Sequence, residues 1–172
     1  MLKKNLNKKI LISHRGNTKG LNPDLENNPK YIESAIKLGF DVEVDVWFLE
    51  GEYFLGHDNP QYKTNLSFLE RLPLWCHAKN VNALSSLISN PKIHCFWHQE
   101  DDVTLTSRGF LWTYPGKKVT EKSICVLPEE IPGLDLGFKT SNLNLNFVDF
   151  STEDLKSCIG YCSDFITLLE DY

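Results

Sequence analysis

The segment from Asp41 to Trp47 most constrains what this chain can fold into, because apolar and acidic residues alternate along it. A period of two is typical of a β-strand, whose successive side chains point to opposite faces. The two sides are Val42, Val44 and Val46 against Asp41, Glu43 and Asp45. The valine-rich side indicates a buried sheet. The carboxylates must therefore point together into the space on the other side.

Glu43 and Asp45 form a candidate metal site. Neighbours on one face of a strand stand roughly 6.5–7 Å apart at their backbones. Two carboxylates at that spacing can converge on one hard divalent cation, whereas unpaired they would repel each other. The alternative interpretation is a solvent-facing polar stripe on an edge strand. We predict that Glu43 and Asp45 are metal ligands.

Two imidazoles and a guanidinium are predicted beside these carboxylates. Residues 10–12 form a short apolar run, which predicts a buried strand with His14 and Arg15 at its carboxyl end. Glu50 and Gly51 predict a tight turn, so that residues 53–55 return as the second arm of a hairpin. Counting back from that turn pairs Leu49 with Glu52 and brings His57 diagonally beside Glu43 and Asp45.

This combination of side chains suits cleavage of a phosphodiester. Such a substrate is anionic and resists attack, so a catalyst must neutralise its oxygens, activate a nucleophile and protonate a leaving alkoxide. Arg15 can donate two hydrogen bonds to phosphate oxygens, and a cation held by the carboxylates adds Lewis acidity. His14 and His57 would share the proton transfers, because imidazole titrates close to working pH.

At these residues the chain resembles the glycerophosphodiester phosphodiesterase family, within the larger group of phosphatidylinositol-phospholipase-like barrels. The matching motifs, in order and spacing over the first third of the chain, are His14-Arg15-Gly16, Glu26-Asn27, Glu43-Val44-Asp45 and His57-Asp58. The resemblance implies that His14 and His57 are the general acid/base pair, Arg15 contacts phosphate, and Glu43 and Asp45 bind the metal. It also implies that Glu26 orders the site.

In the family a neighbouring hydroxyl of the substrate is thought to attack phosphorus, which gives a cyclic phosphate that water then opens. The segment 161–166 resembles the family's final strand, which usually carries a Thr-Asp pair followed by an aromatic residue; here the pair is Ser163-Asp164. The resemblance implies a hydrolase of lipid metabolism that releases an alcohol and a phosphomonoester such as glycerol 3-phosphate.

The third predicted strand, 74–79, departs from the family pattern. Lys79 matches a lysine that would bind the substrate phosphate, but His77 stands where the family has a glutamate. Carboxylates favour Mg²⁺ or Ca²⁺, whereas imidazole suits Mn²⁺ or Zn²⁺. His77 therefore either retunes the metal or leaves the ion one carboxylate short, in which case Glu100, Asp101 or Asp102 is expected to compensate.

The remaining pattern predicts alternating strands and crossovers. Further strands are expected over 92–97, 109–113, 122–126, 145–149 and 161–165, and helices after Asn28-Pro29, over 80–89 and from a cap at Ser151. The fold class expected is α/β: a compact TIM-like (β/α) barrel, with several helices shortened or missing because such barrels usually need roughly 250 residues. Trp112, at a strand end, would wall the pocket against the substrate's alcohol.

Composition excludes several classes of function. With 172 residues and no linker-like run, we expect one domain over residues 1–172. A net charge of -5 argues against a general nucleic-acid or anionic-membrane surface. No apolar run long enough for a signal or membrane span is visible, so a cytoplasmic location is the default expectation. The five cysteines fall mostly in apolar runs and are expected to be buried thiols.

Two alternatives remain open beside a divalent-metal hydrolase acting on a small-molecule phosphodiester. One is a non-catalytic barrel that binds phosphate or sugar phosphate and has lost turnover through the change to His77. The other is a phospholipase-like enzyme that uses both histidines to form a cyclic phosphate. The oligomeric state is not predicted.

Overall fold

The computed structural model describes residues 9–131, 133–134, 136–137, 151–170 and 172. The strands are β1 (Ile10–His14), β2 (Asp41–Leu49), β3 (Glu52–Leu55), β4 (Tyr62–Thr64), β5 (Leu74–Ala78), β6 (Cys95–Phe96), β7 (Val103–Leu105), β8 (Leu111–Thr113), β9 (Ser123–Val126) and β10 (Gly160–Ser163). The helices are α1 (Pro29–Lys37), α2 (Leu66–Leu69), α3 (Val81–Ile88) and α4 (Thr152–Ser157), with 3-10 turns η1 (Pro128–Glu130) and η2 (Ile166–Leu169).

All ten strands belong to one mixed sheet. Its main path is β4-β3-β2-β1-β10-β9-β8-β7, and β5 adds to β2 and β6 to β5. The path from β6 through β5, β2, β1, β10 and β9 to β8 is parallel, whereas β3, β4 and β7 join antiparallel. The carboxyl ends of the parallel strands therefore meet at one edge, as the sequence predicts for the site.

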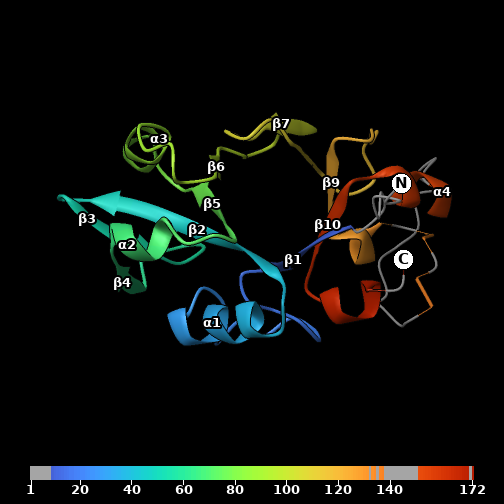
Figure 1. Cartoon of the computed structure of the whole chain (residues 1–172), viewed down its shortest axis with the longest axis horizontal. Helices are drawn as coiled ribbons and strands as arrows, with labels where there is room; N and C mark the ends of the chain where they lie inside the picture. The colour runs from blue at the N-terminus through green and yellow to red at the C-terminus, as the bar shows by residue number, and fades with distance from the viewer. Residues whose placement is uncertain (1–8, 132, 135, 138–150, 171) are drawn as a thin grey trace, which may run out of the picture.

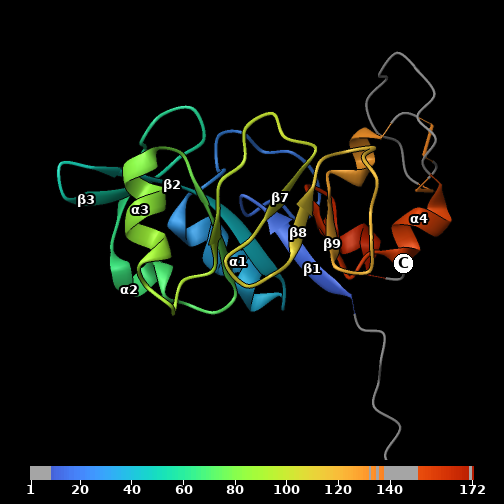
Figure 2. The same ribbon diagram turned by 90° about the horizontal axis from the view of Figure 1, so that it is seen from above.

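The predicted TIM-like barrel is wrong: the sheet curls into a half-barrel, and only four α-helices lie within the described residues (Figure 1). The connections between the later strands are the physical reason. The segment between β6 and β8 contains the antiparallel strand β7 in place of a helix, and the segment between β8 and β9 is short and contains Pro115 and Gly116. In Figure 2, β7, β8 and β9 lie side by side with no helix over them. The strand predicted over 145–149 lies outside the described residues.

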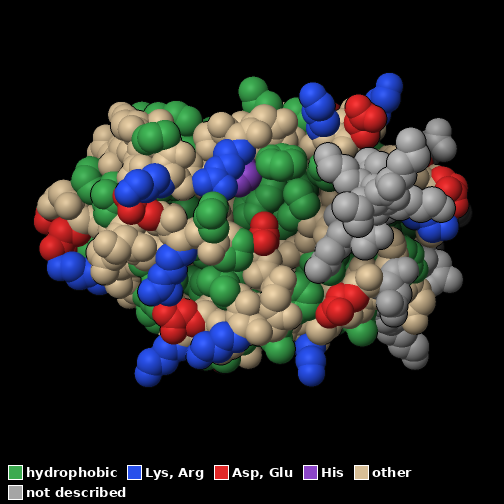
Figure 3. Space-filling view, in the orientation of Figure 1, with side chains coloured by type: hydrophobic (Ala, Val, Ile, Leu, Met, Phe, Trp, Pro, Cys, Tyr) green, Lys and Arg blue, Asp and Glu red, His purple; other side chains and the backbone are tan. Residues whose placement is uncertain are grey.

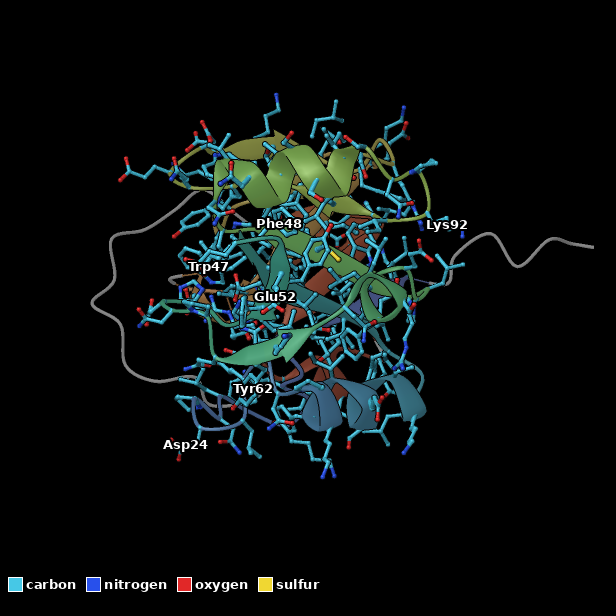
Figure 4. All side chains as sticks on the ribbon, turned by 90° about the vertical axis from the view of Figure 1, so that its left-hand side faces the viewer. Asp24, Trp47, Phe48, Glu52, Tyr62 and Lys92 are labelled. Atoms are coloured by element: carbon cyan, nitrogen blue, oxygen red, sulfur yellow. The ribbon has the colours of Figure 1, made fainter. Side chains whose placement is uncertain are left out.

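Helices cover the outer face of the sheet around β2 and β5. The valine side of β2 packs there against Ile32 and Ala35 of α1 and Ala83 and Leu87 of α3, all of them buried. Figure 4 shows α3 and α1 on opposite sides of the β2 and β3 ribbons, near the labelled Phe48 and Glu52. Burial of the valines confirms the alternation read from the sequence, and it turns Glu43 and Asp45 toward the concave face.

The concave face has its own apolar floor. Buried side chains of six strands meet there: Ile12, Trp75, Phe96, Trp112, Ile124, Val126 and Cys162. The rings of Phe96 and Trp112 lie 4.5 Å apart, and those of Trp75 and Trp112 lie 5.9 Å apart. These large rings fill the space between β6 and β8, which are not paired with each other. The interior beneath the carboxyl ends of the strands is therefore packed with side chains.

Several local predictions are confirmed. Asn28 caps α1 by accepting a hydrogen bond from the backbone of Lys30 at 2.9 Å, and Ser151 begins α4 with a capping box. Leu49 pairs with Glu52 across the predicted turn. All five cysteines are free and buried. Within the described ranges, no helix has the length and apolar character needed to cross a membrane.

In Figure 3, acidic and basic side chains are interspersed over the face shown.

Gly160→Ala is expected to destabilise the fold, because β1 and β10 approach closely at this position. A Cβ at Gly160 would lie 2.3 Å from the backbone oxygen of Ile10, an overlap that only separation of the strands can relieve. We expect a loss of about 2–3 kcal/mol in the free energy of unfolding, measured by urea denaturation. Gly51→Ala is the control: it has open space but a φ of +83°, and should cost about 1 kcal/mol. Equal losses in the two variants would contradict the close approach.

Candidate functional site

A cavity of about 380 Å³ opens at the carboxyl ends of the parallel strands. It is lined by His14, Arg15, Glu43, His57, His77, Lys79, His98, Gln99, Trp112, Tyr114, Val126 and Leu127. Of the residues predicted from the sequence, Asp45 and Glu26 lie behind its wall and contact lining residues. The structure thus brings together side chains from the first strand, the β2 and β3 hairpin and the third predicted strand.

Asp45 is the centre of the charged groups. Its side chain is fully buried, with Arg15 Nε 3.0 Å and His57 Nδ1 3.2 Å from Oδ2, and Lys79 Nζ 3.5 Å from Oδ1. The amide of Asn27 donates to Oδ2 at 2.9 Å, and its oxygen accepts from the backbone nitrogen of Asp45 at 2.9 Å. Asp45 therefore fixes three cationic or titratable side chains around one carboxylate.

The ionised form of Asp45 is favoured despite its burial. Burial alone would raise the pKa of this carboxyl group, but the hydrogen bond from His57, the imidazole of His77 beside it and the charge of Arg15 hold the pKa well below its usual range. The ionised carboxylate in this position attracts the surrounding cations.

Glu43, Asp45 and His77 form a buried cluster that could hold a metal ion. One ligand atom from each residue lies within 4.8 Å of the others. His77 Nδ1 is 3.1 Å from Asp45 Oδ1 and 3.6 Å from Glu43 Oε1. Among the described residues, Asp45 Oδ1 and Glu43 Oε2 are buried without a hydrogen-bond partner. Unpartnered buried carboxylate oxygens fit a cation site, because they have acceptor capacity that no donor uses.

His77 is electrostatically tied to this cluster. Burial lowers the pKa of its imidazole, but the carboxylates of Asp45 and Glu43 close to Nδ1 outweigh burial and raise the pKa to about 9. The sequence expectation that another carboxylate compensates for His77 is not met: Glu100, Asp101 and Asp102 are exposed and lie outside the cluster.

His14 is held by a carboxylate from the last strand. Its Nδ1 donates to Asp164 Oδ1 at 2.8 Å. Burial lowers the pKa of His14, but the bond to Asp164 outweighs it and the pKa is raised. Asp164 also accepts from the amide of Asn17 at 2.8 Å, and its backbone nitrogen donates to the buried Glu129 at 2.8 Å. The ring of His14 is therefore oriented through Nδ1, which leaves Nε2 as its other titratable atom.

Arg15 and Glu26 are locked by the loops that carry them. Arg15 Nη1 donates to Glu26 Oε2 at 3.0 Å, and the amide of Asn17 donates to Glu26 Oε1 at 2.9 Å. Arg15 and Asn27 both have left-handed backbones, with φ of 52° and 61°. Such conformations in non-glycine residues are uncommon and cluster at functional sites. Glu26 thus orders the guanidinium of Arg15.

His57 enters from the loop after β3. The hairpin register continues as counted to Val46 opposite Leu55, and the strand then ends. Gly56 donates its backbone N–H to the carbonyl of Asp45 at 3.2 Å, which brings His57 against Asp45 from outside the ladder. His57 Nε2 lies 3.4 Å from an Arg15 nitrogen.

Trp112 forms part of the cavity wall and is only 4 % exposed. Its contacts with Trp75 and Phe96 make it a packing residue as well as a lining residue. Whether it touches the alcohol of a substrate remains a prediction.

Sequence reasoning assigned no site role to Asn17, Asn27, Glu129 and Asp164. Asn27 and Asp164 belong to motifs on which the family resemblance depends. Their places next to Glu26 and Ser163 were therefore the signal that could have identified them as site residues. Asn17 and Glu129 gave no such signal, because both contact Asp164, which is distant in the sequence. Asn17 lies 147 residues from Asp164, and Glu129 lies 35 residues from it.

Asp164→Asn is expected to lower the pKa of His14 below its usual 6.5, because burial would then act without the opposing carboxylate. In the native protein the raised pKa means that the protonated pair stabilises the fold below pH 6.5 and that this contribution is lost as pH rises through the folded pKa. NMR titration of the histidine rings measures the shift. Urea unfolding should show a larger loss for the variant at pH 6 than at pH 9; an unchanged His14 pKa would contradict the dyad.

No family model, curated protein or solved structure matches the chain when it is compared with each of the three. The resemblance to glycerophosphodiester phosphodiesterases rests on the motifs of this sequence alone.

Proposed function

We propose that this protein is a metal-dependent phosphodiester hydrolase that releases an alcohol and a phosphomonoester such as glycerol 3-phosphate. The observation that carries the proposal is the convergence on Asp45 of two cations and two imidazoles beside a buried metal-type cluster. A cavity of about 380 Å³ is also in the size range of small-molecule sites.

Arg15 and Lys79 would bind the phosphate. Both line the cavity, and both lie against Asp45, at 3.0 Å and 3.5 Å. A guanidinium fixed by Glu26 offers its remaining N–H groups in a set direction, which suits two hydrogen bonds to an oxyanion. Lys79 adds a second positive charge with less directional demand. Together they would offset the charge that makes a phosphodiester resistant to attack.

His14 and His57 would share the proton transfers. Each imidazole has Nδ1 beside a carboxylate: Asp164 at 2.8 Å for His14 and Asp45 at 3.2 Å for His57. For His14 this arrangement favours the tautomer with the proton on Nδ1 and leaves Nε2 to accept or return a proton. His57 Nδ1 also lies 3.3 Å from Lys79 Nζ, and its Nε2 lies 3.4 Å from an Arg15 nitrogen. One ring would deprotonate the attacking hydroxyl group and the other would protonate the leaving alkoxide.

Glu43, Asp45 and His77 would hold the divalent ion. When bound, the ion supplies Lewis acidity at a phosphate oxygen. The two carboxylates suit Mg²⁺ or Ca²⁺, and an imidazole ligand extends the choice to Mn²⁺ or Zn²⁺.

The first test is turnover of a p-nitrophenyl ester of glycerol 3-phosphate, which keeps a hydroxyl group beside the phosphodiester, by the full chain with Mg²⁺, Ca²⁺, Mn²⁺ or Zn²⁺ added in turn. We expect p-nitrophenol release that His57→Ala lowers at least about 100-fold, the usual contribution of a general acid or base. Phosphate binding without turnover under every metal would instead indicate the non-catalytic alternative. Accumulation of a stable cyclic phosphate from a glycerophosphodiester would indicate the phospholipase-like one.

Glu43→Gln is expected to weaken metal binding and activity together, because it removes a ligand charge while nearly preserving shape. Excess metal should restore part of the activity, and a chelator should abolish wild-type activity. Isothermal titration with the metal and initial rates at rising metal concentration measure the two effects. Survival of wild-type activity in the chelator, with no response of the variant to metal, would refute the metal assignment.

The variants His14→Ala and His57→Ala should not be additive. If the two rings serve one reaction, the second substitution removes little beyond the first, as in other catalytic groups that act as a unit. The kcat values of both single variants and the double variant measure this. Fully multiplicative losses would show that the histidines act independently; circular dichroism spectra establish that all three variants are folded.

A further inference from the structure

We propose that His77 coordinates the ion through Nδ1 and makes this site select a divalent transition metal, of the Mn²⁺, Co²⁺ or Zn²⁺ type, over Mg²⁺ and Ca²⁺. The proposal rests on the proposed function for the presence of an ion in the cavity, but it concerns which ion binds and by which atoms. Binding measurements that need no turnover therefore test it.

The hydrogen bonding of His77 fixes which nitrogen is free. Nε2 lies 2.9 Å from the backbone carbonyl oxygen of His98. A carbonyl has no proton to donate, so Nε2 must carry the hydrogen whenever this bond exists. In the neutral ring the lone pair is then on Nδ1, the atom that faces the carboxylates. Metal-binding histidines commonly donate their other N–H to a carbonyl or carboxylate in this way.

The ring is also held in place by packing. His77 stacks on Phe96, with ring centroids 5.0 Å apart and planes 8° from parallel. Its backbone is a partner of Asp45 in the β2 and β5 register and of Phe96 in the β5 and β6 register. The side chain is 12 % exposed. Nδ1 is thus positioned by three adjacent strands, and its approach to Asp45 and Glu43 does not depend on a loop.

The oxygens that would complete the site are buried and unused. Asp45 Oδ1 and Glu43 Oε2 lack a hydrogen-bond partner among the described residues. Asp45 Oδ1 is 3.1 Å from His77 Nδ1, yet this contact leaves it unsatisfied as an acceptor, so the two atoms are not aligned as donor and acceptor. A buried acceptor without a hydrogen-bond partner destabilises the fold. One cation shared by the three side chains would remove that destabilisation.

Charge then decides the class of ion. Mg²⁺ and Ca²⁺ bind through oxygen ligands, and affinity rises with the negative charge of the set. Here the set has two carboxylates, and Asp45 is already neighboured by the cations Arg15 and Lys79. The third ligand is a neutral imidazole, which adds no charge but is a good donor to transition metals. The site is therefore weak for hard ions and favourable for Mn²⁺, Co²⁺ and Zn²⁺.

The direct test is pulsed EPR of Mn²⁺ bound to the full chain with ¹⁵N-labelled histidine. We expect a nitrogen coupling from one imidazole in the wild-type protein and its loss in His77→Glu. This measurement on the wild type needs no variant to fold. Absence of the coupling in the wild-type protein, or its persistence in His77→Glu, would overturn the proposal, as would failure of Mn²⁺ to bind at millimolar concentration.

Selectivity is tested by titrating metal-free protein with Mn²⁺ and Mg²⁺ in a calorimeter. We expect the wild type to bind Mn²⁺ at least about 10-fold tighter than Mg²⁺, and His77→Glu to shift the ratio of the two dissociation constants about 10-fold or more toward Mg²⁺. His94→Gln is the matched control, because His94 is buried on Thr106 outside the cavity. An unchanged ratio in His77→Glu would overturn the proposal. If metal selectivity follows these expectations without turnover, only the proposed hydrolase activity fails.

Discussion

The buried carboxylate of Asp45 is the constraint on which the site depends. An isolated ionised carboxylate in a protein interior is very costly, so it must be paired and hydrogen-bonded to persist. Asn27 satisfies part of this requirement from the loop before α1, and Arg15, His57 and Lys79 supply positive or titratable partners from three other segments. The need to pair the buried carboxylate therefore brings together Arg15 and Lys79, the groups that would bind a phosphate.

A second set of polar contacts extends from this centre to the other end of the cavity. Asn17 donates its amide to both Glu26 and Asp164, at 2.9 Å and 2.8 Å. Glu26 holds Arg15, and Asp164 holds His14. Both imidazoles are thus oriented by carboxylates that belong to one continuous network. Such preorganisation is what electrostatic catalysis requires, because the dipoles are aligned before the substrate arrives. It also means that a substitution at Asn17 would disturb both ends together.

The sequence was informative where chemistry and periodicity coincide in one short segment. The alternation in β2 correctly separated the valines from Glu43 and Asp45 on opposite faces of the strand, because side chains in a strand alternate between its two faces. The turn at Glu50 and Gly51 fixed the hairpin register, because the turn residues and the strands they join are neighbours in the sequence.

The barrel was predicted wrongly, because a parallel strand and a short antiparallel strand have similar patterns of apolar residues. Val103–Leu105 gave no signal of its pairing with β8, and that pairing replaces a helix. The contacts of Glu129 could not be predicted, since they depend on how distant segments meet.

The open sheet explains why a chain of this length can still form such a cavity. The predicted site used only the carboxyl ends of neighbouring strands, and β10, β1, β2 and β5 are paired in that order whether or not the sheet closes. Across the opening, Trp75, Phe96 and Trp112 supply side-chain volume. An apolar floor of this kind excludes water beneath the charged groups, and electrostatic interactions are stronger where water is excluded. Aromatic packing would thus form a low-dielectric base for the proposed ion and phosphate, a role that the interior of a closed barrel would otherwise have.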